Sequence, residues 1–197
     1  MAGLAAAIRL AARGEPVKLL EKQAYPGGKM RPVDVAGIAI DAGPTVFTMK
    51  WVFDQLFGES GSEFDDTLGH SKAETLARLA WDDRGIFDLF ADRQRSEMAI
   101  GEFFDAQNAA GYRRFCADGQ SIFQTLQNTF MAAPRPNPLQ LAQRVGMHRL
   151  PTLLSLRPFS TLWGALGDYF PDPRLRQLFG RYATYVGSSP FQAPATL

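Results

Sequence analysis

The sequence predicts an α/β fold in its first part and a mainly helical α+β fold in the rest. Three observations lead to this prediction: an Ala-rich segment that stops at Gly14, a short apolar run that ends in Glu21, and later apolar residues at helical spacing. With 197 residues, of which 46% are hydrophobic, the chain is long enough to bury a core in one large domain or two small ones.

The elements of the first part follow from propensity and turn residues. Residues 3–13 are rich in Ala, Leu and Ile and predict a helix that ends at the next glycine. Residues 17–21 predict a short strand, and residues 33–40 have strand character as well. Apolar residues at helical spacing after Thr48 predict a helix that ends at Gly58.

The second part begins with a predicted β-hairpin. Residues 76–81 and 86–90 are rich in apolar residues, and they flank the turn sequence Asp82–Gly85. Residues 96–131 then predict mostly helix, because their apolar side chains recur at helical spacing.

Proline residues interrupt the helical part. The segment 134–138 breaks the chain, and Asn137 is expected to cap a helix that has Pro138 at its first position. A further helix is predicted from Phe159 to Phe170. The aromatic side chains of residues 103–130 and 159–170 fit two interpretations, a tunnel for a long apolar molecule or an ordinary core.

Composition argues against several classes of function. The net charge is +1 with acids and bases intermixed, so we expect no nucleic-acid partner. Cys116, His70 and His148 lie too far apart to suggest a metal site, and one cysteine cannot form an internal disulfide. No apolar run reaches about 18 residues, so no membrane-spanning helix is predicted.

The first part matches the later half of a dinucleotide-binding unit. Such a unit has a strand, a glycine-rich turn, a helix whose N-terminus faces pyrophosphate, and a second strand that ends in an acid. Gly3 fits the third glycine of this pattern, and Glu21 follows 18 residues later (21 − 3) to accept from ribose hydroxyls. The first strand and two glycines are absent, so we expect the chain to begin inside the motif. A plain βαβ crossover is the alternative.

Three short segments carry a more specific resemblance. Glu21–Lys22, Pro26–Arg31 and Asp41–Thr45 together resemble the FAD-binding half of amine-oxidase-type and carotenoid-desaturase flavoproteins. The physical chemistry agrees, because two glycines let the backbone approach a phosphate closely and neighbouring cations can offset its charge. An ordinary turn at the glycine doublet remains the alternative interpretation.

Two longer segments narrow the resemblance. Asp41–Met49 is similar to the phytoene desaturase family, and Leu178–Pro190 to the branch that acts on hydroxylated or methoxylated acyclic carotenoids. That branch introduces a 3,4 double bond beside the end group. The similarity runs from Gly3 to Leu197. The chain also lacks the late segment that completes the flavin site in this family, so we expect it to be shortened at both ends.

The resemblance implies a fold and a cofactor. We expect a Rossmann-like α/β FAD-binding domain without its first strand at 1–75, and an inserted, mainly helical α+β substrate domain at 76–197. The residues expected to bind FAD are Gly3, Glu21, Lys22, Gly27, Gly28, Lys29, Arg31, Pro44 and Thr45. No residue is assigned as a catalytic acid or base, although Asp118 is a candidate for handling a proton. No metal is expected.

The resemblance also implies a partner and a location. FAD is expected to take a hydride from a carotenoid substrate. The intact protein is expected in the bacterial cytoplasm, peripheral on the cytoplasmic membrane in which its substrate dissolves. Residues 150–170 could rest on that membrane or form a buried helix with snorkelling arginines. The alternatives to 3,4-desaturation are phytoene or neurosporene desaturation, and a non-catalytic truncated or interaction module.

Overall fold

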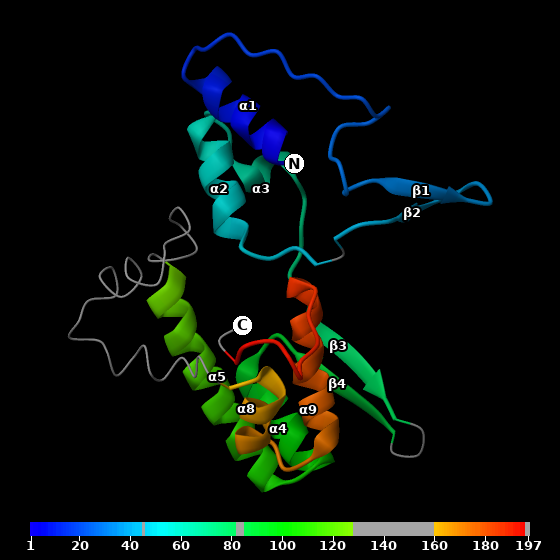
Figure 1. The fold of residues 1–197 in the computed structure, drawn as a ribbon, viewed down its shortest axis with the longest axis vertical. Helices are drawn as coiled ribbons and strands as arrows, with labels where there is room; N and C mark the ends of the chain where they lie inside the picture. Colours follow the sequence, from blue (N-terminus) through cyan, green and yellow to red (C-terminus); the bar gives the residue numbers. More distant parts are fainter. Residues whose placement is uncertain (45, 82–84, 128–159, 196–197) are drawn as a thin grey trace. The chain divides into compact units, whose positions relative to one another are not determined.

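The computed structural model describes residues 1–44, 46–81, 85–127 and 160–195 (Figure 1). These residues fall into two compact units, Met1–Lys72 and Ala73–Leu197, and each unit is described by itself. The sequence predicts an FAD-binding part up to residue 75 and a substrate-binding part after it. These two functional assignments stay predictions.

The first unit opens with the predicted Ala-rich helix. Helix α1 covers Ala2–Ala12, which confirms the predicted helix. Gly14 follows its end with a φ of +82°, a left-handed conformation that suits glycine. The N–H of Gly14 donates to Ala11 at 2.9 Å and the N–H of Glu15 to Leu10 at 3.1 Å. This paired arrangement satisfies the last carbonyls of the helix.

The strand predicted at residues 17–21 is not formed. This segment has no regular structure, and Leu20 is 81% exposed. A strand needs a neighbour that accepts its hydrogen bonds, and among the described residues the only sheets are two antiparallel hairpins. The strand prediction for residues 17–21 is therefore wrong for the described part of this chain, because apolar composition alone provides no partner strand.

The strand predicted over residues 33–40 is a hairpin instead. Strand β1 covers Pro32–Val35 and strand β2 covers Ile38–Asp41, paired antiparallel. Ala36 and Gly37 connect them with φ values of 55° and 84°. Two central residues with positive φ define the tight turn that matches the twist of a hairpin. Because strand-like residues continue through the whole segment, the sequence pattern alone did not show where the chain reverses.

Helices α2 (Lys50–Glu59) and α3 (Phe64–Thr67) complete the first unit. The helix predicted after Thr48 is confirmed as α2, but Gly58 lies inside it. The left-handed residue beyond its end is Gly61, with a φ of +79°. Phe64 is buried among the rings of Phe47, Phe53 and Phe57, which form the aromatic centre of this unit.

The second unit begins with the predicted hairpin. Strand β3 covers Thr75–Ala80 and pairs antiparallel with β4, Ile86–Phe90, which confirms the prediction. Residues 82–84 of the predicted turn lie outside the described residues. Phe87 and Leu89 alternate with exposed or half-buried residues and point into the core.

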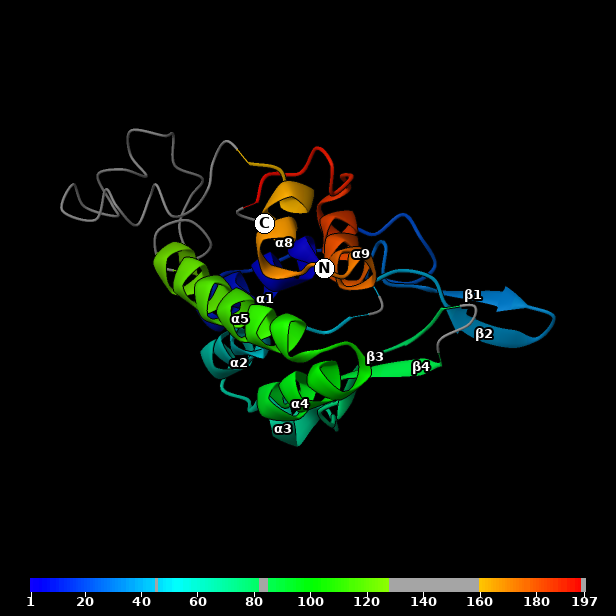
Figure 2. The same ribbon diagram turned by 90° about the horizontal axis from the view of Figure 1, so that it is seen from below.

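The helices of the second unit pack on that hairpin (Figures 1 and 2). The region predicted as helix contains α4, Arg93–Phe103, and α5, Ala106–Leu126. Asp105 separates the two helices because its carboxylate caps α5 and accepts from the N–H of Asn108 at 2.7 Å. The predicted break at residues 134–138, with its Asn137 cap, lies outside the described residues.

Helix α8 (Leu162–Tyr169) confirms the helix predicted within residues 159–170. Helix α9 (Pro173–Gly180) and the 3₁₀-helix η3 (Arg181–Val186) were not predicted. Figure 2 shows α8 and α9 side by side. The core of this unit consists of Phe87, Leu89, Ile100, Tyr112, Leu162, Leu166, Phe170, Leu175, Leu178, Phe179, Ala183 and Ala193. Among the described residues, no helix is both long and apolar enough to cross a bilayer.

Candidate functional site

The N-terminus of α1 lies beside the predicted glycine turn. The ammonium group of Met1 donates to the carbonyl oxygen of Gly27 at 3.5 Å. Gly27 and Gly28 have φ values of +125° and +66°, which residues with a Cβ atom rarely adopt. A Cβ atom on Gly27 would also lie 2.8 Å from the oxygen of Met30. The fold therefore brings Gly27 and the start of α1 together and requires glycine in the turn.

The first turn of α1 is open to an anion. Met1 provides no side-chain cap, and the first turn contains no acidic residue. Its free N–H groups and the helix dipole give this end a partial positive charge that attracts phosphate. Gly3 is exposed in this turn, and a Cβ atom there would lie 3.6 Å from Leu19 Cδ1, an ordinary packing distance. The position of Gly3 thus fits a phosphate nearby, while its predicted role against a sheet has no counterpart here.

Lys29 and Arg31 are the two cations predicted for the site. Their backbone lies where the β1–β2 pairing continues toward the glycine turn. The N–H of Ala42 donates to the carbonyl of Arg31 at 3.0 Å, so the hairpin pairing continues beyond Pro32 and Asp41. One step further, a Cβ atom on Gly43 would overlap the carbonyl oxygen of Lys29. Only glycine allows this backbone approach.

The side chains of Lys29 and Arg31 are exposed. In the described part of the chain, neither side chain pairs with a carboxylate. Their charges are available to a phosphate group, and a guanidinium suits such a ligand because it can donate two parallel hydrogen bonds.

The structure does not bring every predicted residue to this place. Glu21 Oε1 accepts from the N–H of Gln23 at 2.9 Å, a bond within its own turn. Lys22 and Pro44 are exposed, and Thr45 lies outside the described residues. No bond among the described residues links Glu21, Lys22 or Pro44 to the start of α1. The roles predicted for all of these residues stay predictions.

The start of α1, the turn of Gly27 and Gly28, and the cations Lys29 and Arg31 nevertheless fit the diphosphate part of a dinucleotide. An uncapped helix N-terminus, two glycines with positive φ and two exposed cations form the set of groups that binds phosphate oxygens. Glu21 is the residue available to accept from a ribose hydroxyl, although its present bond ends at Gln23. The arrangement therefore fits a phosphate group as it stands, whereas a bond to ribose would require Glu21 to give up its bond to Gln23.

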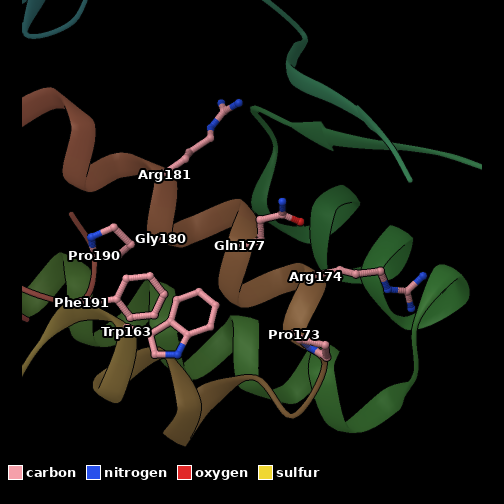
Figure 3. A pocket seen from close by; sticks show the side chains of 8 residues that line it. All are labelled: Trp163, Pro173, Arg174, Gln177, Gly180, Arg181, Pro190 and Phe191. Carbon is pink, nitrogen blue, oxygen red and sulfur yellow. The ribbon is translucent and has the colours of Figure 1, made fainter. Parts of the chain in front are cut away.

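The second unit has a groove of about 610 Å³ between α8, α9 and the segment that follows η3 (Figure 3). It is lined by Trp163, Pro173, Arg174, Gln177, Gly180, Arg181, Pro190 and Phe191. Sequence reasoning assigned residues 178–190 to a family motif but did not identify a groove there. The Asp172–Pro173 pair, a helix cap followed by proline, was the overlooked sign of α9.

The sequence left two interpretations of its aromatic residues open, a tunnel for a long apolar molecule or an ordinary core. The described aromatic residues do not all lie in the same kind of place. Tyr112 and Phe170 are in the core, and Phe103 and Phe104 pack against it. Trp163, by contrast, is only half-buried and lines the groove. Within the described residues the predicted aromatic stripes are therefore mostly core, with Trp163 as an exception.

Two further sequence candidates have structural partners. The hydroxyl of Tyr169 donates to Asp118 Oδ2 at 2.6 Å, which joins α8 to α5. This bond gives Asp118 a structural role, and its handling of a proton stays a prediction. His70 Nδ1 lies 3.5 Å from Asp65 Oδ1. Across the described ranges, no group of three His, Cys, Asp or Glu residues could hold a metal ion.

Comparison with known proteins gives matches over the whole chain. The sequence profile of the family described as "Flavin containing amine oxidoreductase" matches residues 1–192. Hydroxyneurosporene desaturase of Rubrivivax gelatinosus is 47% identical over 200 residues, which cover 100% of this chain and 38% of that protein. The 1-hydroxycarotenoid 3,4-desaturase of Flavobacterium sp. (strain P99-3) is 31% identical over 100% of this chain and 40% of that protein.

A third relative has a different name. Phytoene dehydrogenase of Streptomyces griseus is 32% identical over 99% of this chain and 38% of that protein. The chain thus spans about two fifths of the length of these relatives. The matches confirm the resemblance that the sequence motifs indicated.

Proposed function

Because this chain belongs to the flavin containing amine oxidoreductase family, we propose that it forms part of an FAD-dependent carotenoid desaturase. The observation that carries the proposal is the position of the uncapped start of α1 beside the turn of Gly27 and Gly28. This pair of elements offers backbone N–H groups and close backbone approach to a diphosphate.

Several of the predicted residues have a task in the proposed cofactor site. The first turn of α1 and the glycine turn would bind the pyrophosphate, and Lys29 and Arg31 would offset its charge. Glu21 would exchange its bond to Gln23 for one to a ribose hydroxyl. When bound, FAD supplies the hydride acceptor that converts a C–H-bearing single bond to C=C. The accompanying proton goes to a base that this chain does not identify.

The substrate class is proposed from the relatives. The relative with 47% identity is named for hydroxyneurosporene, and one with 31% identity is named for 3,4-desaturation of a 1-hydroxycarotenoid. We propose a hydroxylated or methoxylated acyclic carotenoid as substrate and 3,4-desaturation as the step. Phytoene desaturation is the second candidate, favoured by the 32% identity to a phytoene dehydrogenase.

Location is part of the same proposal. A carotenoid dissolves in lipid, so we propose that the whole protein works at the bacterial cytoplasmic membrane as a peripheral protein. In the segment considered for membrane contact, residues 150–170, the part from 150 to 159 lies outside the described residues. Co-sedimentation of the protein with lipid vesicles is the direct measurement, and a protein that stays in the supernatant would refute this part.

A chimera tests the activity. This chain replaces the corresponding region of the Rubrivivax gelatinosus enzyme, to which it aligns over its whole length. We expect the purified chimera to retain FAD and to convert hydroxyneurosporene in preference to phytoene. A chimera that prefers phytoene supports the second candidate. A folded chimera that binds no flavin supports the non-catalytic alternative.

Glu21 gives the test of cofactor contact. In the chimera, Glu21→Ala removes a charge-assisted hydrogen bond worth about 1.5–3 kcal/mol, so FAD affinity should fall roughly ten- to a hundredfold. Glu15→Ala is the matched control, because Glu15 is an exposed acid close to Glu21 in the sequence. Equal FAD affinity in the two variants would remove Glu21 from the site.

A further inference from the structure

The groove of the second unit is fixed by backbone bonds. The N–H of Trp163 donates to the Pro190 carbonyl at 2.9 Å, and the N–H of Leu162 to the Ala193 carbonyl at 2.8 Å. Gly180 of α9 admits Pro190, whose Cβ would lie 3.4 Å from a Cβ added to the glycine. The segment 190–193 is thereby tied to α8, and the shape of the groove follows from the fold.

The interior of the groove is apolar. The rings of Trp163 and Phe191 lie 4.8 Å apart between centroids, and Phe191 is 59% exposed. Pro173 and Pro190 add two further apolar surfaces, and no carboxylate lines the groove. In Figure 3 the side chains of Arg174 and Arg181 extend away from the ring pair. The space over the two rings suits a planar, apolar molecule.

Both arginines at the rim lie over aromatic rings, and Arg174 is also paired with a carboxylate. Arg174 forms two bonds with the Asp172 carboxylate, at 3.0 and 2.7 Å, and stacks over the Phe104 ring at 4.6 Å. Arg181 lies over the Tyr182 ring at 5.5 Å. The groove is therefore not organised around an anion, since a site for phosphate or carboxylate would direct these guanidinium groups inward.

One polar group at the rim is oriented and has donors to spare. Trp81 Nε1–H donates to Gln177 Oε1 at 2.9 Å, which fixes the orientation of the amide because an indole can only donate. The two N–H groups on Gln177 Nε2 have no acceptor among the described residues. An apolar groove with an amide donor held in place by a hydrogen bond complements a long apolar molecule that carries one hydroxyl or ether oxygen.

We propose that this groove binds the oxygenated end of a carotenoid, with the polyene over Trp163 and Phe191 and its oxygen accepting from Gln177 Nε2. The proposal rests on the proposed function for the class of substrate. It goes further by naming the residues that distinguish a hydroxylated carotenoid from the unsubstituted one. Gln177 acts here as a specificity residue, and no chemical step is assigned to it.

Binding to the 197-residue chain tests the proposal without catalysis. Hydroxyneurosporene and neurosporene, delivered from identical detergent micelles, differ only at the end group. Quenching of tryptophan fluorescence gives both dissociation constants, and Trp163→Leu shows which part of the signal comes from the groove. We expect the hydroxylated carotenoid to bind about two- to tenfold more tightly, the range of one neutral hydrogen bond.

Two variants separate the hydrogen bond from the stacking. Gln177→Glu keeps an acceptor for Trp81 but loses the amide donor, so the preference for the hydroxylated carotenoid should disappear. Phe191→Ser should weaken both carotenoids by a similar factor and leave the preference intact. Gln107→Leu, an exposed glutamine on α5, is the control and should behave as the parent chain. Circular dichroism confirms that each variant is folded.

The outcomes distinguish this proposal from the function on which it rests. Equal affinities of the parent chain for the two carotenoids, or an unchanged preference in Gln177→Glu, would overturn the role of Gln177. If neither carotenoid quenches Trp163 while the chimera still converts hydroxyneurosporene, the groove proposal fails and the proposed function stands. If the chimera is inactive but the groove keeps its preference, the reverse holds.

Discussion

Gly111 of α5 contacts the backbone of Tyr169 at the end of α8 so closely that a Cβ atom on Gly111 would overlap the Tyr169 carbonyl oxygen. The side chains beside this contact support it, because the Tyr169 hydroxyl donates to Asp118 and the Phe115 ring packs on Tyr169 at 5.6 Å. The crossing of α5 and α8 therefore depends on one missing methyl group, and α8 in turn carries Trp163 of the groove.

Gly111→Ala should destabilise the second unit by about 1–3 kcal/mol, the usual effect of overpacking. Urea unfolding followed by circular dichroism measures the change. Gly119→Ala is the control, since this glycine lies on the same helix with nothing within 4 Å of an added Cβ. It should leave stability unchanged or raise it by up to about 1 kcal/mol, because Ala favours helix. Equal midpoints for both variants would show that α8 moves freely.

Gly43→Ala should weaken FAD binding in the chimera. The added Cβ displaces the Lys29 carbonyl and with it the turn of Gly27 and Gly28. Strain of about 1–3 kcal/mol corresponds to a loss of roughly five- to a hundredfold in affinity. The control is Gly58→Ala in α2, where an added Cβ meets nothing within 4 Å. Titration of apoprotein with FAD gives both affinities, and a match between them would place the cofactor elsewhere.

Asn108 joins the starts of two helices and should be needed for stability. Its side chain is 1% exposed, donates to Asp105 Oδ2 at 2.9 Å and accepts from the N–H of Asp172 at 3.3 Å. Asn108→Ala leaves the partly buried N–H of Asp172 without this acceptor, so unfolding should become easier by about 1–3 kcal/mol. Exposed Gln107, one residue earlier, gives the control Gln107→Ala. A thermal melt in which both variants equal the parent would contradict this role.

Cys116 should react slowly with iodoacetamide in the folded chain. Burial raises the pKa of its thiol above the ordinary value, and burial also raises the pKa of neighbouring Tyr112. The thiolate fraction at pH 8 is therefore lower than that of a free cysteine, and the rate should keep rising above pH about 8.5, the ordinary pKa at which a free cysteine is already half ionised. Cys116 is the sole cysteine, so intact mass measures the reaction unambiguously.

The raised pKa of the Cys116 thiol also makes the stability of the folded chain depend on pH. A group whose pKa is raised on folding contributes stability below its unfolded pKa and loses that contribution as the pH rises through the folded pKa.

Alkylation of Cys116 in urea should be fast at pH 8, whereas the folded chain reacts slowly. Equal rates in both conditions would show that the thiol is fully accessible.

Local signals in the sequence predicted the elements that depend on local chemistry. Gly14 marked the end of α1, and the turn before Gly85 marked the hairpin of β3 and β4. Helix α9 carried a local signal too, Asp172 before Pro173, which was overlooked. Residues 17–21 were predicted wrongly because a strand exists only with a partner, and strand propensity describes one chain segment alone.

The candidate site shows the same limit. Gly27 and Gly28 could be selected from sequence because a doublet of glycines suggests unusual backbone angles. Their position beside Met1, 26 residues away, is a contact that no local pattern encodes. The groove was missed for this reason: Trp163 and Phe191 come from separate segments and meet only when residues 190–193 pair with α8.

The β1–β2 hairpin has a consequence for the order of folding. Its register pairs residues close in sequence, from Val35 with Ile38 to Pro32 with Asp41, so each pair closes only a short loop. Hairpins of this kind form in about 1–10 μs, faster than contacts that wait for distant segments. The same ladder aligns Arg31 with Ala42. The backbone beside the glycine turn can thus take its native shape early, before α1 packs beside it to complete the proposed phosphate-binding surface.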